Sequence, residues 1–127
     1  MTDKTYVEEY TAVVKTLSKY LESCAKADSS IMQPAFHPDA AMFTVGESGV
    51  TRAPIQALFD GIDNDFEPST PNSAIVTVDI VGTVASARVD SDNLDGFRFS
   101  DFFHLLEANG EWQIVAKTFH THSTPTN

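Results

Sequence analysis

The chain has 127 residues, an apolar content of 42% and a formal net charge of −10. This length and composition suit one globular domain, and we expect residues 1–127 to fold as a single unit. The acidic balance argues against nucleic-acid and anionic-membrane partners, because the chain lacks a basic stripe that could displace phosphate counterions.

The cellular compartment is inferred from the N-terminus and the cysteine content. Met1 is followed by polar residues and a helical pattern, not by the apolar segment of a secretory signal. The single cysteine, Cys24, rules out a disulfide within the chain, and no apolar run approaches the ~20 residues of a membrane span. The sequence therefore predicts a cytoplasmic protein.

Residues 4–27 are predicted to form a long amphipathic helix, in which Thr5 and Glu8 match a capping box; Asp3 is the alternative cap. Tyr20 lies within its apolar stripe, so the phenol must bind a buried partner or reach a cavity. A core tyrosine bonded to backbone and a tyrosine in a pocket both satisfy this pattern. The apolar stripe comprises Tyr6, Tyr10, Val13, Val14, Leu17, Tyr20, Leu21 and Cys24.

Short elements follow this helix. Asp28 and the two serines after it break the helix and cap a new one. The expected elements are a short helix at 30–36, a strand at 40–45, a return strand at 50–52, a third helix at 54–64 and a loop at 67–72.

Two β-hairpins are predicted in the second half of the chain. Gly82-Thr83 is typical of a type II′ turn within residues 73–92, and Asn109-Gly110 is typical of a type I′ turn within residues 97–122. The alternation of the first hairpin predicts one covered apolar face, formed by Val76, Val78, Ile80, Ala85, Ala87 and Val89.

The register of the second hairpin predicts which side chains share a face. A two-residue turn pairs Ala108 with Glu111, and side chains then alternate along both strands. One face would carry Phe99, Asp101, Phe103, Leu105, Ile114, Ala116, Thr118 and His120; the other would carry Arg98, Ser100, Phe102, His104, Leu106, Val115, Lys117 and Phe119. A carboxylate and an imidazole among apolar groups predict a pocket on the first face. Exposed aromatic groups on the second predict a homodimer interface.

Helices followed by antiparallel strands define an α+β fold, with the helices gathered on one face of a curved sheet. Four features resemble the nuclear transport factor 2-like (NTF2-like, or cystatin-like) family, and within it the SnoaL-like or putative lumazine-binding branch. The resemblance implies a cone-shaped, mainly antiparallel sheet wrapped around three N-terminal helices. The features are Tyr20 eight residues before Asp28, the run 36–43, the strand pair 81–89, and Asp101-x-Phe103 leading into 109–115.

Comparison with the ketosteroid isomerases of this family implies a donor pair without a base. Those enzymes hold a dienolate oxygen with a tyrosine and a protonated aspartate, whose positions match Tyr20 and Asp101. Their catalytic carboxylate falls at or beside Thr44, where this chain has none. A hydroxyl cannot replace a carboxylate in proton abstraction, so the comparison argues against isomerase activity of that kind.

Asp101 and Tyr20 form the first candidate site. A carboxyl in an apolar pocket can stay protonated, so the two groups could donate to a carbonyl, enol or phenol oxygen. The alternative is a hydrogen bond that serves the structure alone. In a second candidate, Asp101 orients His120 as a general base, and its alternative is a histidine without a catalytic role.

A metal site is a further alternative for the histidines. His120 and His122 recur on one strand face and could share an ion with Asp101 or His37. Because this spacing is common by chance, we predict neither a metal nor a cofactor.

The leading prediction is a protein that binds a small, flat, partly polar ligand through Tyr20, Asp101 and His120. One alternative is an isomerase, cyclase or dehydratase that uses Asp101 and His120 as acid and base. A second alternative is a dimeric interaction module without a ligand, which a pocket sealed by side chains would support. The remaining ligand-binding residues are predicted to be Phe99, Phe103, Thr44, Met42, Phe59 and Thr118.

Overall fold

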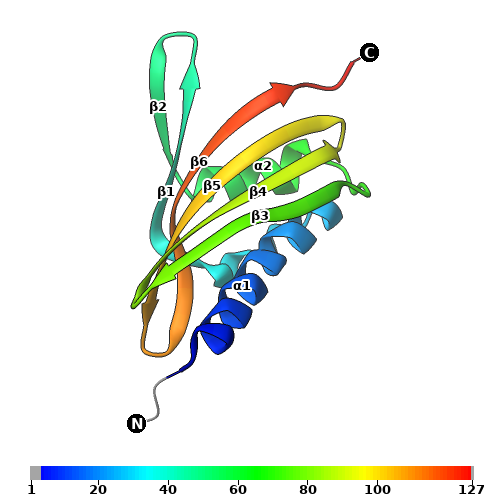
Figure 1. Ribbon diagram of the computed structural model, residues 1–127. Coiled ribbons are helices and arrows are strands. Elements are labelled where there is room, and N and C mark those ends of the chain that lie inside the picture. The colour runs from blue at the N-terminus through cyan, green and yellow to red at the C-terminus, as the bar shows by residue number, and fades with distance from the viewer. Residues whose placement is uncertain (1–3, 127) are drawn as a thin grey trace.

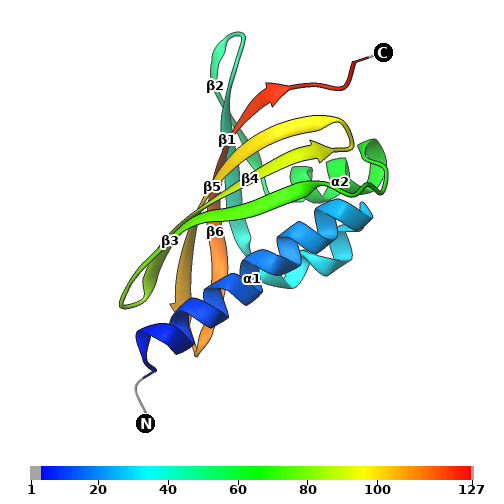
Figure 2. The ribbon, with the colours of Figure 1, turned by 45° about the vertical axis from the view of Figure 1, so that its right-hand side comes forward.

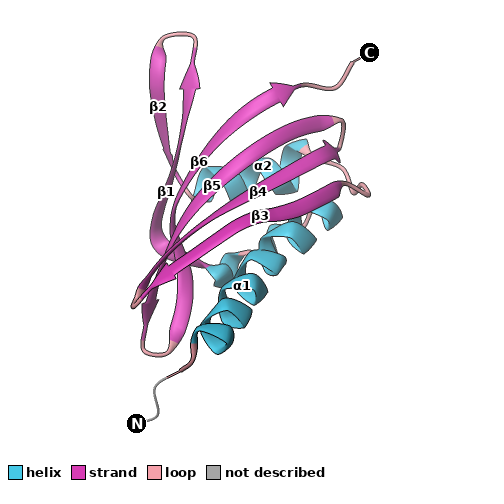
Figure 3. Cartoon of the chain, viewed as in Figure 1, coloured by secondary structure: helices cyan, strands magenta, loops and turns pink. Residues whose placement is uncertain are grey.

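The structure, a computed structural model, describes residues 4–126, so the predicted domain of residues 1–127 extends past the described part at both ends. Within residues 4–126, no helix combines the length and the hydropathy that crossing a bilayer demands. The elements (Figure 3) follow in the order α1 (Tyr6–Lys26), the 3₁₀ turns η1 (Ser29–Ile31) and η2 (Gln33–Ala35), β1 (Phe36–Gly46), β2 (Gly49–Pro54), α2 (Gln56–Asp65), β3 (Asn72–Val81), β4 (Val84–Leu94), β5 (Phe97–Ala108) and β6 (Glu111–Ser123).

The six strands formed by the described residues make one mixed sheet in the order β2-β1-β6-β5-β4-β3. β1 and β6 run parallel, and the other neighbours are antiparallel. The sheet is strongly curved, and both α1 and α2 lie on the same side of it (Figures 1 and 2). This arrangement confirms the predicted α+β cone. The helix expected at 30–36 is instead two 3₁₀ turns, because Phe36 already pairs with Ile114 in the sheet.

The first helix follows its predicted pattern closely. Thr5 and Glu8 form the expected capping box, in which each side chain accepts a hydrogen bond from the other residue's backbone N–H. The middle of the apolar stripe packs against the sheet, with Val13, Leu17 and Tyr20 buried. At the start of α1 the stripe is exposed, so the predicted burial of Tyr6 and Tyr10 is wrong.

Both predicted hairpin turns are present. Asn109 and Gly110 have φ of 54° and 78°, as a type I′ turn requires, and Gly82 has φ of 58° at the first position of its turn. The pairing that each turn starts is also as predicted, since Ala108 faces Glu111 and Val81 faces Val84.

Further along the strands, two β-bulges shift the predicted register. In β6 the pairing passes from Leu105–Ile114 to His104–Ala116, so Val115 is an extra residue. From Ala116 to Thr121 the β6 side chains therefore lie on the opposite face from the one predicted, because faces alternate residue by residue; the register shifts again after Thr121. A second bulge at Val76 in β3 has the same effect: Ile75 faces the core, and Val76, predicted to be covered, is 46% exposed.

Candidate functional site

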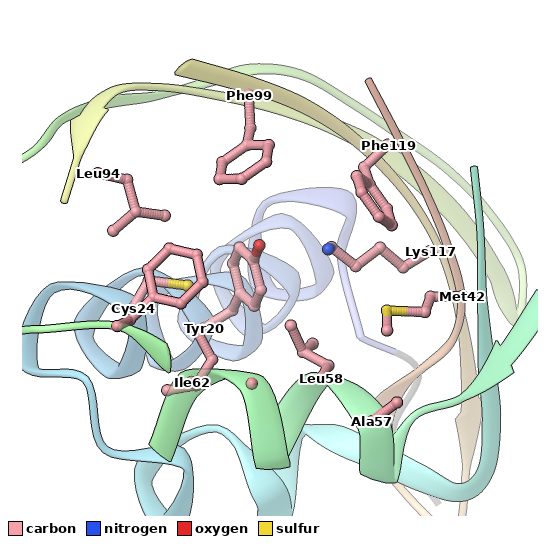
Figure 4. Close-up of a pocket in the computed structure, with 12 residues that line it drawn as sticks. Tyr20, Cys24, Met42, Ala57, Leu58, Ile62, Leu94, Phe99, Lys117 and Phe119 are labelled. Atoms are coloured by element: carbon pink, nitrogen blue, oxygen red, sulfur yellow. The ribbon is translucent and has the colours of Figure 1, made fainter. Parts of the chain in front are cut away.

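A partly open cavity of about 170 Å³ lies between α1, α2 and the curved sheet (Figure 4). Its wall is apolar apart from the Tyr20 hydroxyl and the Lys117 amine, both of which point into the space in Figure 4. The lining residues are Tyr20, Cys24, Met42, Ala57, Leu58, Gly61, Ile62, Phe66, Leu94, Phe99, Lys117 and Phe119.

Tyr20 reaches the cavity from the buried face of α1. Its ring packs edge-on against Phe103, with centroids 5.0 Å apart, and against Phe36 at 6.4 Å. These contacts hold the hydroxyl where it donates a 2.9 Å hydrogen bond to Oδ2 of Asp101. The predicted meeting of Tyr20 and Asp101 is therefore confirmed. Burial and the nearby carboxyl raise the pKa of Tyr20 well above its usual value, so the phenol keeps its proton.

Asp101 lies behind the cavity wall, on β5, and only 2% of its surface is exposed. Oδ2 accepts from Tyr20, while Oδ1 is 3.8 Å from the Lys117 amine and has no hydrogen-bond partner among the described residues. Burial raises the pKa of Asp101, and Lys117 and Tyr20 oppose that rise. The carboxyl therefore contacts both polar groups of the cavity without facing the cavity itself.

Lys117 is the site residue that the sequence analysis missed. The predicted register puts Lys117 on the outer face, but the bulge at Val115 turns it inward, opposite Phe103 on β5 and beside Met42 on β1. Only 5% of the residue is exposed, and its amine lies 4.2 Å from the centre of the Phe119 ring, a favourable position for a cation. A signal was present: Ile114 and Phe119 are an odd number of residues apart, so both can face inward only if the strand contains an extra residue.

The predicted ligand-binding residues divide into three groups. Met42 and Phe99 line the cavity. Phe103, Phe59 and Thr44 lie outside the cavity wall. The two phenylalanines are buried in the core, and the Thr44 hydroxyl donates to the backbone carbonyl of Phe119. The remaining one, Thr118, lies exposed on the outer face of the sheet because of the bulge.

His120 is also on the outer face, so the prediction that it shares a face with Asp101 is wrong. His120 pairs with Ser100, and the centroid of its ring lies 4.7 Å from the ring centroid of His122. His122 Nε2 is in turn 2.8 Å from the Ser100 hydroxyl. Over residues 4–126, no three His, Cys, Asp or Glu side chains come together in a way that could hold a metal ion.

Cys24 contributes a thiol to the cavity wall, one turn along α1 from Tyr20. Burial raises the pKa of this thiol to about 12. Since the thiolate is the nucleophilic form of cysteine, Cys24 provides an apolar surface at neutral pH.

The direction of the Tyr20–Asp101 hydrogen bond depends on the ionisation of the carboxyl. When Asp101 is ionised it can only accept, and the phenol O–H is committed to it. When Asp101 is protonated it can donate to the phenol oxygen, which frees the phenol O–H for a ligand acceptor. The site can thus hold an oxygen-bearing group and pass a proton to or from it.

The fold and the cavity place the chain in the NTF2-like class, and solved structures support this. The chain is similar to an NTF2-like protein of unknown function from Shewanella baltica OS155, with a TM-score of 0.92, 53% identity, and coverage of 96% of this chain and 100% of that one. It is also similar to one from Methylobacillus flagellatus KT, with a TM-score of 0.86, 35% identity, and coverage of 97% and 99%.

The chain belongs to the family described as "Putative lumazine-binding", whose sequence profile matches residues 8–120. The predicted resemblance is therefore confirmed for both the superfamily and the branch. Among curated proteins, Aldolase FrzH from Cladobotryum sp is 28% identical over 115 residues, which cover 90% of this chain and 92% of that protein.

Proposed function

We propose that this protein binds a small, flat, partly polar organic molecule in the cavity between α1, α2 and the sheet. The observation that carries the proposal is the pair of polar groups, the Tyr20 hydroxyl and the Lys117 amine, directed into an otherwise apolar space. Such a site buries the apolar part of a ligand and orients its polar end.

The size of the cavity favours a ligand with one ring. An apolar protein cavity of about 150 Å³ can hold a benzene molecule, and this cavity measures about 170 Å³. Larger ligands would extend through its opening. The opening also disfavours the alternative of a ligand-free interaction module, which a sealed pocket would support.

The polar groups favour a ligand with a single oxygen-bearing end, such as a carbonyl or a phenol. The family description names lumazine, a pteridine rich in ring nitrogens and carbonyl groups. In this cavity most of those groups would lack partners, and each buried, unpaired polar group costs about 1–3 kcal/mol. We therefore expect ring-sized aldehydes, ketones and phenols to bind more tightly than lumazine.

A thermal-shift screen with these compounds and lumazine tests the proposal. The expected result is a rise in melting temperature with the single-ring compounds, which is reduced in Tyr20→Phe and Lys117→Met. His120→Ala is the matched control, because His120 lies on the outer face and its loss should leave binding unchanged. No stabilisation by any compound, or an equal loss in His120→Ala, would contradict the proposal.

A second candidate function is an enzyme that acts next to a carbonyl group. It is favoured by the Tyr20–Asp101–Lys117 contacts, in which a carboxyl with a raised pKa connects a phenol and an amine, and by the similarity to a protein named an aldolase. Lys117 takes the place of the predicted His120 in this scheme. The test is hydrogen–deuterium exchange beside the carbonyl of a bound ketone, followed by NMR; exchange that persists in Lys117→Met would count against it.

We also propose a homodimer that forms through the outer face of the sheet. Phe102, Leu106 and Val84 are large apolar residues exposed on that face, which is unfavourable for an isolated monomer. Phe119, predicted to share this interface, lines the cavity instead.

The cytoplasmic location stays a prediction.

A further inference from the structure

Lys117 differs from every other lysine of the chain in its surroundings. Of the five lysines, all within the described residues, only Lys117 lies in the wall of the cavity. The others are on or beside α1 and are exposed or half-buried: Lys4, Lys15, Lys19 and Lys26. A buried amine that points into a ligand cavity is positioned as a nucleophile as well as a hydrogen-bond donor.

We propose that Lys117 forms a covalent imine with an aldehyde or ketone bound in the cavity. The inference rests on the proposed function, because it requires that the cavity accept a carbonyl compound. It adds a residue role, a bond type and a substrate class that binding alone does not imply.

The contacts around Lys117 supply the proton transfers that imine formation needs. The amine is 3.8 Å from Oδ1 of Asp101, and the other oxygen of the same carboxyl is 2.9 Å from the Tyr20 hydroxyl. One carboxyl therefore connects the nucleophile to the phenol. Oδ1 has no hydrogen-bond partner among the described residues, so it is free to take a proton from the ammonium, which leaves a neutral amine and a protonated carboxyl.

The step balances without an outside base or acid. The nitrogen lone pair forms a C–N bond, and the π electrons of the carbonyl move to its oxygen, which takes a proton from Tyr20; Asp101 reprotonates Tyr20. The nitrogen then gives a proton to Asp101, and Asp101 passes a proton through Tyr20 to the hydroxyl of the adduct. Water leaves as the C=N bond forms. The net change converts a carbonyl and an ammonium to a protonated imine and water.

The cavity walls also protect the product. Apolar residues surround the amine, with the Phe119 ring 4.2 Å away and Met42 and Leu58 also lining the cavity. Limiting water around the C=N bond slows its hydrolysis, which is one function of closed active sites.

Reductive trapping tests the proposal directly. The protein is incubated with benzaldehyde or cyclohexanone and sodium cyanoborohydride, which reduces imines to stable amines, and is then analysed by intact mass and peptide mapping. We expect a single adduct, with the mass of the probe less one oxygen, on Lys117. It should form at least about tenfold faster than adducts on the exposed lysines, as for other activated amines.

Variants separate the roles of the groups. Lys117→Met should abolish the adduct, and Tyr20→Phe should slow its formation about 100-fold, the scale of general acid catalysis. If Lys117→Met does not fold, the double variant Asp101→Asn/Lys117→Met replaces it, because it removes the carboxylate together with the amine. The peptide map of the unaltered protein also tests the inference without any variant. Adducts spread over Lys4, Lys15, Lys19 and Lys26, with Lys117 unmodified, would overturn the inference.

The failure of this inference can be told apart from failure of the proposed function. Thermal shift without the reductant reports occupancy of the cavity, whether or not the bound probe also forms an imine. Stabilisation by the probes without trapping at Lys117 would overturn the imine and leave the binding proposal intact. Neither stabilisation nor trapping would count against both.

Discussion

Asp101 is buried with one carboxyl oxygen hydrogen-bonded and the other facing an amine at 3.8 Å. Taking a carboxyl and an amine out of water is unfavourable unless their hydrogen bonds are complete. Oδ1 has no hydrogen-bond partner among residues 4–126, so this group does not stabilise the fold as well as an apolar side chain could. An incomplete polar cluster beside a cavity is the arrangement expected where function outweighs stability.

The Tyr20 hydroxyl should stabilise the protein through this carboxyl. Tyr20→Phe leaves Oδ2 buried without its donor, and we expect the free energy of unfolding to fall by about 1–3 kcal/mol. The loss of the donor should also raise the pKa of Asp101 further, since the hydrogen bond lowers it now. Urea unfolding measures the first effect, and NMR titration of the carboxyl carbon measures the second.

Tyr10→Phe is the matched control, because Tyr10 lies on the same helix with an exposed side chain. Its substitution should change the free energy of unfolding by less than about 0.5 kcal/mol. Equal effects of the two substitutions would show that the buried hydrogen bond contributes nothing.

The raised pKa of Asp101 predicts a defined pH dependence of stability. The folded protein binds this proton more tightly than the unfolded chain, whose aspartates titrate near pH 3.9. The contribution of Asp101 is therefore fully present below that pH and is lost as the pH rises through the folded-state pKa. Relative to Asp101→Asn, the unaltered protein should lose stability as the pH rises, as measured by urea unfolding at a series of pH values.

Asp63 provides a control of opposite sign. Its carboxylate accepts two hydrogen bonds from Ser29, which lower its pKa. Its contribution should be present above the unfolded-state pKa and disappear as the pH falls. If the Asp101→Asn and Asp63→Asn differences changed with pH in the same direction, the assignment of a raised pKa to Asp101 would be wrong.

At the scale of the elements, the bulge at Val115 determines the chemistry of the cavity. Without an extra residue, a β6 strand in the predicted register would place Ala116 and Thr118 beside Phe103 and Asp101. With it, Lys117 and Phe119 take those places. Bulges often redirect side chains next to active sites, and here the bulge replaces a small, neutral wall with an amine and an aromatic ring.

The second helix has a separate role, because α2 forms the opposite wall of the cavity with Ala57, Leu58, Gly61 and Ile62. Gly61 lies in the interior of α2, and a methyl group added there would meet only Asp65 Oδ2, at 3.9 Å. Gly61→Ala should therefore raise the free energy of unfolding by about 0.5–1 kcal/mol, as glycine-to-alanine changes inside helices do.

The same substitution should weaken ligand binding, because Gly61 is part of the cavity wall. Calorimetric titration with a single-ring ketone, together with urea unfolding, measures both effects on one variant. Gain of stability with unchanged affinity would indicate that ligands do not approach α2. Loss of stability would contradict the open space beside Gly61.

At the scale of the whole molecule, the sheet has two faces with different surroundings. The helices cover one face and enclose the cavity, while the other carries exposed apolar side chains on its central strands, among them Phe102, 52% exposed, beside the Arg88 guanidinium. A stable dimer needs about 800 Å² of buried surface on each partner, and an open face of a six-stranded sheet can supply such an area.

Phe102→Glu tests this dimer. A charge at the centre of the proposed interface should convert the dimer to a monomer in analytical ultracentrifugation without loss of the folded state. Val50→Glu is the control, because Val50 is also apolar and is more exposed than Phe102 but lies on the β1–β2 hairpin. A monomeric parent protein, or a dimer disrupted by Val50→Glu alone, would contradict an interface on the sheet face.

Much of the fold could be predicted because its signals are local. Asn109-Gly110 specifies a turn through positive φ at two successive residues, and the capping box of Thr5 and Glu8 marks the start of α1. Tyr20 and Asp101 could be expected to meet, since each lies on the apolar face of its element. The strand β5 has no extra residue between the turn and Asp101, so Asp101 keeps its predicted face.

The sequence by itself thus determined the long first helix, the two hairpin turns and the Tyr20–Asp101 contact. The inward direction of Lys117, and with it the outward direction of His120 and Thr118, was decided only by the tertiary structure. The bulge that sets these directions lies where β6 changes register against both β5 and β1. Strand register of this kind depends on partners distant in the chain, and a shift of one residue reverses every side chain beyond it.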